Sequence, residues 1–323
     1  MYVLGLQGSP RVKGNTNFLL DAFLGECQSR GAAVEKIQAR RLHVEPCTGC
    51  GTCEKKGVCI FTDDDMARRM YFLLWRADLV VLASPVYFYN FPAPIKAVID
   101  RSQALWSRKY KLGLEDPGRA WRQGFMLSVG ATKGKNLFDG MALTARYFFD
   151  AAGAAYTDAV TYRRIEAAGE LEKQPGVFDD VKAAVEKADP LFSRKKILFA
   201  CRENACRSQM AAGFARQMAG DRIEALHAGS TPADRVNPQM QEAMAEKGID
   251  MAYRSTRTIE DVVAETTPEL IVTMGCGEQC PYIPGVTYID WDLPDPAGRS
   301  IEFMRQVRDE IEQRVRQLVA DYA

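Results

Sequence analysis

Residues 196–208 read Lys-Ile-Leu-Phe-Ala-Cys-Arg-Glu-Asn-Ala-Cys-Arg-Ser, a short apolar run that leads at once into a polar loop. A helical pattern follows at 208–219. Apolar strands that alternate with helices are typical of a parallel sheet buried on both faces. Three further strands and a long amphipathic helix are expected after it, at 224–228, 270–274, 286–290 and 300–321.

The chain begins with the same order of elements: an apolar run at 2–6, a loop, and an amphipathic helix at 16–30. The remaining strands of this half are expected at 33–38, 77–84 and 124–129, and its helices at 63–76, 93–106 and 137–152. We therefore predict an α/β protein with two doubly wound parallel-sheet domains, residues 1–190 and 191–323. The segment 190–196 is the expected linker.

The composition of the 323 residues is that of a globular protein, with 47% apolar residues and equal numbers of basic and acidic side chains, 42 of each. A disordered chain is excluded, and zero net charge argues against a nucleic-acid partner. Residues 77–99 are the most apolar stretch, but three prolines interrupt it, so no membrane span is expected. The N-terminus lacks a signal pattern, and we expect a cytoplasmic protein.

The chain has nine cysteines but only two histidines. Most of the cysteines fall in tight groups: 47/50/53/59, 201/206 and 276/280. An odd number of cysteines in a reducing compartment argues against a disulfide framework and favours metal binding or thiol chemistry.

Cys201 and Arg207 enclose five residues, the spacing Cys-x5-Arg. The amides of such a loop can surround a tetrahedral oxyanion, with the thiolate below it and the guanidinium clamping two oxygens. The arginine and the helix N-terminus favour a thiolate, which makes Cys201 a candidate nucleophile. Ser208 is placed to donate a hydrogen bond to its sulfur, and Asn204 to brace the loop. The alternative is a buried cysteine without chemistry. We interpret Cys206 and His227 as structural.

The first loop, Gly8-Ser-Pro-Arg-Val-Lys-Gly-Asn-Thr16, has the character of a phosphate cradle because it joins a strand to a helix N-terminus. Its expected contributors are two glycines that allow close approach, three hydroxyl or amide donors and two cations: Gly8, Gly14, Ser9, Asn15, Thr16, Arg11 and Lys13. A capped turn without a ligand is the alternative. Two later loops also follow buried strands, where doubly wound sheets bind ligands. Their candidate residues are Pro85, Val86, Tyr87, Phe88, Tyr89, Gly130, Ala131 and Thr132.

Four cysteines lie within 13 residues, at Cys47, Cys50, Cys53 and Cys59. Four thiolates can bind one cubane iron–sulfur cluster or one tetrahedral metal ion. Three readings stay open: a cluster, a zinc site, or a cysteine loop without metal.

Taken together, the three ligand loops resemble those of the flavodoxin-like NAD(P)H-dependent FMN reductases and iron-sulfur flavoproteins, over residues 1–155. The resemblance implies FMN, with its phosphate on residues 9–16 and its ring beside residues 85–89 and 130–132. It implies NAD(P)H as reductant, a 4Fe–4S cluster on the four cysteines, and a homodimer formed across the flavin site.

The Cys201 loop and the later Asp295-Pro296 resemble the low-molecular-weight tyrosine phosphatases and their arsenate reductase branch, over residues 195–323. The resemblance implies that Asp295 is the general acid. In thioredoxin-coupled arsenate reductases two cysteines occupy the region of Cys276 and Cys280, which would form a thiol relay with Cys201.

The two resemblances together suggest an arsenate reductase whose electrons come from a flavin domain in the same chain, with thioredoxin as a possible further partner. Two alternatives stay open. One is a phosphotyrosine phosphatase fused to a flavoprotein. The other is a non-catalytic redox sensor or electron-transfer protein whose loop only binds phosphate or sulfate.

Overall fold

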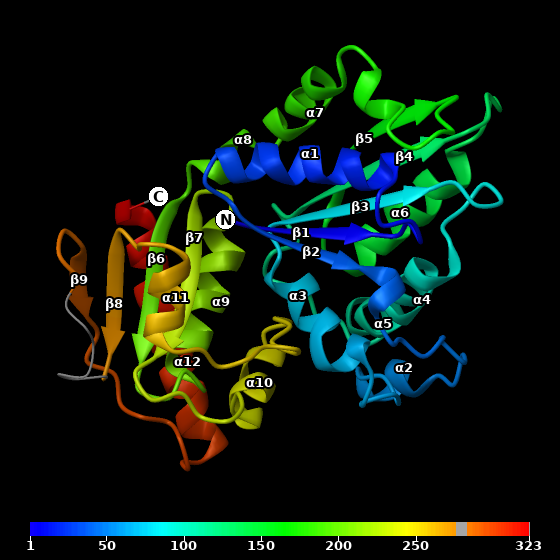
Figure 1. Ribbon diagram of the computed structural model, residues 1–323. Helices are drawn as coiled ribbons and strands as arrows, with labels where there is room; N and C mark the ends of the chain where they lie inside the picture. Colours follow the sequence, from blue (N-terminus) through cyan, green and yellow to red (C-terminus); the bar gives the residue numbers. More distant parts are fainter. Residues whose placement is uncertain (276–282, 323) are drawn as a thin grey trace. The chain divides into compact units, whose positions relative to one another are not determined.

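The computed structural model describes residues 1–275 and 283–322, so the predicted relay cysteines Cys276 and Cys280 lie outside the described residues. The chain divides into two compact units (Figure 1). The first comprises Met1–Gly113 and Trp121–Phe192, and the second comprises Leu114–Ala120 and Ser193–Ala323.

The first unit contains a five-stranded sheet in the order β2-β1-β3-β4-β5, all of whose pairs are parallel. Its strands are β1 (Tyr2–Gln7), β2 (Ala33–Gln38), β3 (Leu79–Pro85), β4 (Gln123–Gly130) and β5 (Ala155–Arg163). This strand order is the flavodoxin-like one, in which ligands bind where the strand order reverses, between β1 and β3.

Helices cover both faces of this sheet, as its continuous apolar strands require. The elements are α1 (Asn15–Ser29), α2 (Thr52–Lys56), α3 (Tyr71–Arg76), α4 (Ala93–Arg101), α5 (Gln103–Tyr110), α6 (Asp139–Ala151), α7 (Val177–Glu186) and α8 (Asp189–Phe192). Figure 1 shows α1 and α7 on one side of the strands, with α3, α4 and α5 on the other. Short turns of 3-10 or π helix lie at Ala39–Arg41, Met66–Met70 and Leu171–Lys173.

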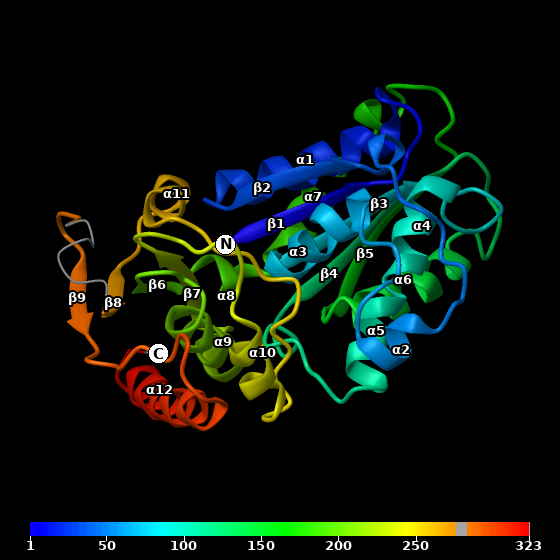
Figure 2. The same ribbon diagram turned by 90° about the horizontal axis from the view of Figure 1, so that it is seen from below.

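The second unit contains a four-stranded parallel sheet in the order β7-β6-β8-β9. Its strands are β6 (Lys195–Cys201), β7 (Ile223–Gly229), β8 (Leu270–Met274) and β9 (Thr287–Asp290). Its helices are α9 (Arg207–Ala219), α10 (Pro238–Ala245), α11 (Ile259–Glu265) and α12 (Ile301–Tyr322). Figure 2 shows α9, α10 and α12 grouped together, and a separate apolar cluster joins α11 to the sheet.

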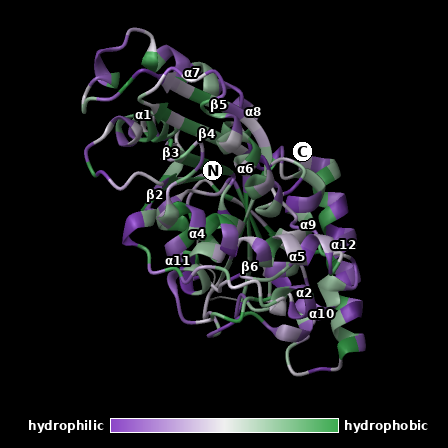
Figure 3. Cartoon of the chain, turned by 90° about the vertical axis from the view of Figure 1, so that its right-hand side faces the viewer, coloured by the Kyte–Doolittle hydropathy of each residue, from purple (hydrophilic) through white to green (hydrophobic). Residues whose placement is uncertain are grey.

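The cores follow the sequence pattern. The interior residues of β1, β3 and β6 are buried, and the helices present apolar residues inward at helical spacing. Figure 3 shows hydrophilic and hydrophobic residues alternating along α12. Its buried side chains recur every three or four positions: Met304, Val307, Arg308, Ile311, Val315 and Leu318.

The predicted fold class is confirmed, but several elements differ from the sequence-based expectation. β5 is missing from the prediction because it is an edge strand, mostly half-exposed, whose apolar pattern is weak. The helix expected at 93–106 is two helices that meet at Ser102, and the one expected at 63–76 starts with a π turn. The expected linker begins inside α8.

The segment Leu114–Ala120 belongs to the second unit although the first unit surrounds it in sequence. Its Glu115 makes two backbone hydrogen bonds with the turn after α10: it donates to the Gly248 carbonyl at 2.8 Å and accepts from the Asp250 amide at 2.8 Å. The second unit is thus completed by residues from between α5 and β4. Within the described residues, no helix combines the length and apolarity needed to cross a bilayer.

Candidate functional site

The thiol of Cys201 lies at the C-terminal end of β6, in register with Gly229 of β7 and Met274 of β8. The residue is buried, and its sulfur has two neighbours that stabilise a thiolate. The Asn204 amide donates to Sγ at 3.2 Å, and the Ser208 hydroxyl lies 3.0 Å from it. The sequence predicts the Ser208 contact, whereas it predicts Asn204 only as a brace of the loop.

The loop after Cys201 turns its carbonyl groups outward. The carbonyls of Cys201, Arg202, Glu203 and Ala205 accept hydrogen bonds from backbone amides within residues 230–237, over 2.8–3.1 Å. A loop whose carbonyls are held on its outer side leaves its amides facing inward, which is the arrangement that binds an anion. The start of α9 at Arg207 adds the positive end of a helix dipole.

Asn204 lies at the centre of the hydrogen-bond network around Cys201. It is fully buried in a left-handed conformation, with φ at +50°. Its Nδ2 donates to Ser208 Oγ at 2.7 Å. Its Oδ1 accepts from the Arg257 amide at 3.0 Å and lies 3.1 Å from His227 Nδ1. His227 therefore contacts the hydrogen-bond network around the sulfur. The sequence indicates a structural role for His227 but does not predict this contact.

Arg207, which ends the Cys-x5-Arg loop, contacts the predicted general acid, Asp295. Its Nη2 donates to Asp295 Oδ2 at 2.8 Å, and its Nη1 donates to the Leu293 carbonyl at 3.1 Å. The Asp295 side chain is 48% exposed, whereas that of Arg207 is 6% exposed. The exposed carboxyl is thus accessible, and the buried guanidinium fixes its position.

Cys206 is the second thiol of this loop, and burial makes it a poor nucleophile. Burial, with smaller contributions from the charges of Cys201 and Asp295, raises the pKa of Cys206 to about 12. Cys201, five residues away, is also buried, but its sulfur has the Asn204 amide and the Ser208 hydroxyl beside it.

The loops predicted to bind a cofactor surround one cavity of about 200 Å³ at the C-terminal edge of the first sheet. From the predicted set it is lined by Ser9, Arg11, Gly14, Asn15, Thr16, Pro85, Val86, Tyr87 and Ala131. Among the described residues, six of the predicted set do not line it: Gly8, Lys13, Phe88, Tyr89, Gly130 and Thr132. Residues after the missed strand β5 also contribute, namely Ile165, Glu166 and Ala168.

The Asn15 side chain joins the first loop to the segment after β5. Its Nδ2 donates to the Ala167 carbonyl at 2.8 Å, and its Oδ1 accepts from the Leu171 amide at 3.2 Å. Asn15 thus closes one wall of the cavity. Ser9, which accepts from the Arg11 amide at 3.2 Å, and Thr16 remain the hydroxyl donors at the helix N-terminus.

A tight turn after β3 carries three aromatic residues. Tyr87 and Asn90 exchange two backbone hydrogen bonds of 2.9 Å, and the two residues between them, Phe88 and Tyr89, have φ of +48° and +59°. The turn lies against the start of α6, where a Cβ on Gly140 would come within 2.6 Å of the Tyr89 carbonyl oxygen. The Phe88 side chain is completely exposed.

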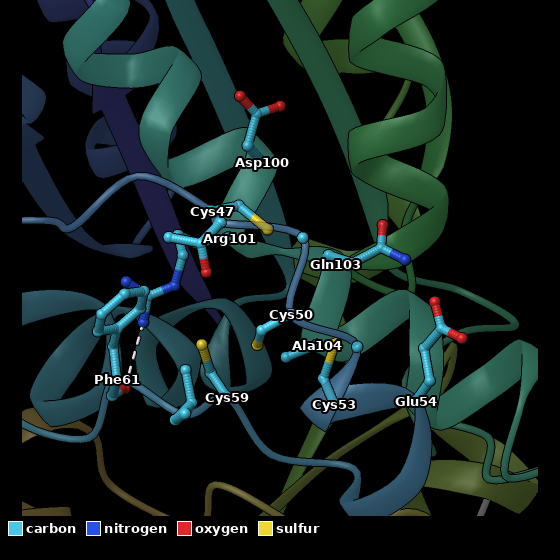
Figure 4. Close-up of a pocket in the computed structure, with 14 residues that line it drawn as sticks. Cys47, Cys50, Cys53, Glu54, Cys59, Phe61, Asp100, Arg101, Gln103 and Ala104 are labelled. Carbon is cyan, nitrogen blue, oxygen red and sulfur yellow. Dashed lines mark hydrogen bonds between the residues drawn. The ribbon is translucent and has the colours of Figure 1, made fainter.

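The four cysteines of the 47–59 loop line a second cavity, of about 380 Å³. Figure 4 shows their side chains around it, above α2 and beside the α4–α5 junction. Ser107 Oγ donates to Cys53 Sγ at 3.4 Å, and Thr52 Oγ1 lies 3.4 Å from Cys50 Sγ. The spacing of the cysteines thus brings all four to one cavity.

The family relationships agree with these two sites. Residues 1–162 match the family model of the NADPH-dependent FMN reductases, and residues 196–323 match that of the low molecular weight phosphotyrosine protein phosphatases. The chain belongs to the NADPH-dependent FMN reductase family through its first unit, and through its second to the family of phosphatase-like arsenate reductases. It is an oxidoreductase, and its first family supports FMN and NAD(P)H as cofactors.

Particular relatives match each half separately. A glutaredoxin arsenate reductase from Synechocystis is 37% identical over 128 residues, which are 39% of this chain and 97% of that protein. An iron-sulfur flavoprotein from Archaeoglobus fulgidus is 45% identical over 102 residues, 31% of this chain but only 45% of that protein. A solved arsenate reductase in the phosphate binding state is 34% identical, covering 40% of this chain and 99% of that one, with a TM-score of 0.37.

Proposed function

We propose that this protein reduces arsenate to arsenite at Cys201, with electrons supplied through its own flavin domain. The observation that carries the proposal is the cradle of Cys201: a buried sulfur between an amide and a hydroxyl, below a loop whose carbonyls point outward. Such a cradle fits a small tetrahedral oxyanion, and Arg207 is placed to clamp two of its oxygens. The arsenate reductases among the relatives support the choice of anion.

The first step forms a sulfur–arsenic bond. The Cys201 thiolate attacks arsenic(V), an As–O bond breaks, and Asp295 gives its proton to the leaving oxygen, which departs as water. Arg207 holds the remaining oxygens and also holds the carboxyl of Asp295 at 2.8 Å, so that acid and nucleophile meet one ligand.

The second step is proposed from sequence, since Cys276 and Cys280 lie outside the described residues. The Cys276 thiolate attacks Cys201 Sγ, and the sulfur–arsenic bond breaks so that arsenic keeps the electron pair and leaves as arsenite. Cys280 then attacks Cys276, which frees Cys201 and leaves a Cys276–Cys280 disulfide. Two thiols have lost two electrons, and arsenate has gained them. Each turnover therefore needs a two-electron donor. Thioredoxin is the further partner that the assay below includes.

The first unit has the residues to hold FMN, which when bound would carry electrons from NAD(P)H to thiols. The observation behind this fit is the cavity of about 200 Å³ where Ser9 and Thr16 meet the N-terminus of α1. Tyr87 and Pro85 line the same cavity and offer a flat apolar wall for a ring.

The four cysteines that line the second cavity offer the ligand set of a cubane iron–sulfur cluster, one thiolate for each iron. In a cubane each thiolate binds a different iron, so the ligands stand further apart than around one zinc. Cys47, Cys50, Cys53 and Cys59 would hold it, and it would supply one-electron transfer.

We also assign the exposed aromatic turn to a homodimer contact. Five large side chains are exposed on the turn and on α6, which it contacts: Tyr87, Phe88, Tyr89, Leu143 and Tyr147. Leu143 and Tyr147 are four residues apart and so share one face of α6. An apolar patch of this kind beside a ligand cavity is suited to association with a second copy.

An anaerobic assay tests the proposed function. The full chain, loaded with FMN, receives NADPH and arsenate, with and without thioredoxin, and arsenite and NADPH are both measured. We expect one arsenite for each NADPH oxidised, no arsenite from Cys201→Ser, and nearly full activity from the matched control Cys206→Ser. Aryl phosphate hydrolysis by a Cys276→Ser/Cys280→Ser variant, with no arsenite from the native chain, would instead establish a phosphatase.

A further inference from the structure

The four-cysteine loop rests on a buried ion pair between Arg101, the last residue of α4, and Asp64. Arg101 is 1% exposed and Asp64 is 4% exposed. The Asp64 carboxylate also accepts hydrogen bonds of 3.0 Å from the amides of Glu45 and Ala67. A buried ion pair is costly to desolvate, so its presence here calls for a role beyond stability.

The guanidinium of Arg101 holds both ends of the loop. Its Nη1 donates to the Glu45 carbonyl at 2.8 Å, two residues before Cys47. Its Nη2 donates to the Phe61 carbonyl at 3.2 Å, two residues after Cys59, and its plane lies over the Phe61 ring at 5.0 Å. Figure 4 shows Arg101 and Phe61 together at the edge of the cysteine cavity.

One donor of this guanidinium is not used by the protein. Nε of Arg101 is buried and makes no hydrogen bond within the described chain, although Arg101 lines the cavity of the four cysteines. A buried N–H without a partner is rare and indicates a missing acceptor. The cavity beside it is the place where such an acceptor would lie.

We infer that Arg101 is a positioning residue for the cluster: it fixes both ends of the four-cysteine loop and gives the bound cluster a buried positive charge and an N–H donor. The inference rests on the proposed cluster. Hydrogen bonds to the sulfurs and local charge set the reduction potential of such clusters. Because reduction adds negative charge, a neighbouring cation favours the reduced form.

The test uses the full chain, reconstituted anaerobically with iron and sulfide, and its readout is the reduction potential of the cluster. For Arg101→Gln we expect the ratio of reduced to oxidised cluster, at a fixed applied potential, to fall about tenfold, which is about 59 mV for one electron. Asp64→Asn removes the opposing charge and should shift the ratio the other way. Arg101→Lys keeps the charge and should stay near the native value.

Arg108→Gln is the matched control, because Arg108 contacts the same loop at the Gly57 carbonyl, at 3.0 Å, but does not line the cavity. Its ratio should change less than about threefold. Native potentials in both Arg101→Gln and Asp64→Asn, at full iron content, would overturn the inference. If Arg101→Gln does not fold, the potential of Asp64→Asn tests the inference alone, and a native value in that variant would overturn it.

Proteolysis of the metal-free protein separates this inference from the proposed cluster. Trypsin can cleave within the loop after Lys55 and Lys56. Because a lysine cannot hold two carbonyls in the planar fork of an arginine, both Arg101→Gln and Arg101→Lys should be cleaved several-fold faster than the native chain. Unchanged cleavage overturns the role in holding the loop, whereas a native chain that binds no iron overturns the cluster itself.

Discussion

The proposed nucleophile, Cys201, is held by a hydrogen-bond network that extends to His227. Asn204 Oδ1 lies 3.1 Å from His227 Nδ1. The Nδ2 of the same Asn204 side chain donates to Ser208, whose hydroxyl contacts the sulfur, so His227 helps to fix the position of both. Because an amide oxygen only accepts hydrogen bonds, Nδ1 of His227 carries the proton in this contact.

Replacing His227 with leucine should slow alkylation of Cys201 by iodoacetamide and lower kcat/KM for arsenate about tenfold, because Asn204 loses one buried donor. His227→Asn places an amide N–H near the position of Nδ1 and should restore most of both values. The pH profile of alkylation, measured by mass spectrometry, checks this. Equal losses in the two variants would mean that the histidine serves only packing.

The neighbouring thiol allows a prediction on stability and pH. Burial raises the pKa of Cys206 from 9.0 to about 12, so the folded state favours the neutral thiol. The contribution of this thiol to the free energy of unfolding is complete below pH 9. It is lost as the pH rises towards 12, by up to about 1.4 kcal/mol per pH unit. Urea unfolding at several pH values should show a shallower alkaline loss in Cys206→Ala. An unchanged slope would contradict the assignment.

The elements around the Cys201 loop leave no space for a side chain at Gly229. A Cβ on Gly229, at the end of β7, would lie 2.7 Å from the Arg202 carbonyl oxygen and 2.8 Å from the Asn204 amide nitrogen. Both neighbours are backbone atoms of the loop after Cys201, so neither can move without changing that loop.

Gly229→Ala should therefore destabilise the protein by about 1–3 kcal/mol and weaken phosphate binding at least tenfold, because overpacking displaces the loop. Denaturant unfolding and isothermal titration with phosphate measure the two effects. Gly25→Ala is the control: it lies in α1 with open space around its Cβ and should stabilise by up to about 1 kcal/mol. A Gly229→Ala variant that binds phosphate normally would contradict the loop geometry.

The turn after β3 has aromatic residues, Phe88 and Tyr89, at two positions with positive φ. Asparagine and glycine adopt positive φ at lower cost, so they would make the turn more stable. Phe88→Asn/Tyr89→Gly should raise the free energy of unfolding by about 1–2 kcal/mol while weakening self-association. Thermal unfolding and sedimentation velocity check the pair of effects. Phe178→Asn, an exposed aromatic on α7, is the control and should leave association unchanged.

At the level of the complete chain, the second unit needs residues from the middle of the first half. The Glu115 amide donates to Gly248 at 2.8 Å, and proline at this position would remove that donor. Glu115→Pro should lower the unfolding free energy of the second unit by about 1–3 kcal/mol. Glu115→Ala, which loses only a 3.3 Å ion pair with Arg119, should cost less than about 0.5 kcal/mol.

Hydrogen exchange that resolves peptides of the second unit is the suitable measurement, because it reports on the region around Ile249 separately. If Glu115→Pro exchanges like the native protein there, the segment Leu114–Ala120 contributes nothing to that unit.

The features that could be predicted from the sequence are those that lie within one short segment of the chain. The apolar run before Cys201, the five-residue spacing to Arg207 and the dense cysteines between positions 47 and 59 each lie within one segment, so their chemistry is visible without a fold. Both parallel sheets follow from the same kind of pattern, and the predicted fold class is confirmed.

What only the tertiary structure decided are the contacts between distant segments. His227 and Arg257 reach Asn204, Arg101 holds two carbonyls on either side of the cysteine loop, and Leu114–Ala120 completes the second unit. No periodicity or spacing encodes these pairs. They arise because strand order and helix packing bring together groups whose burial must be balanced by hydrogen bonds, whatever their separation in sequence.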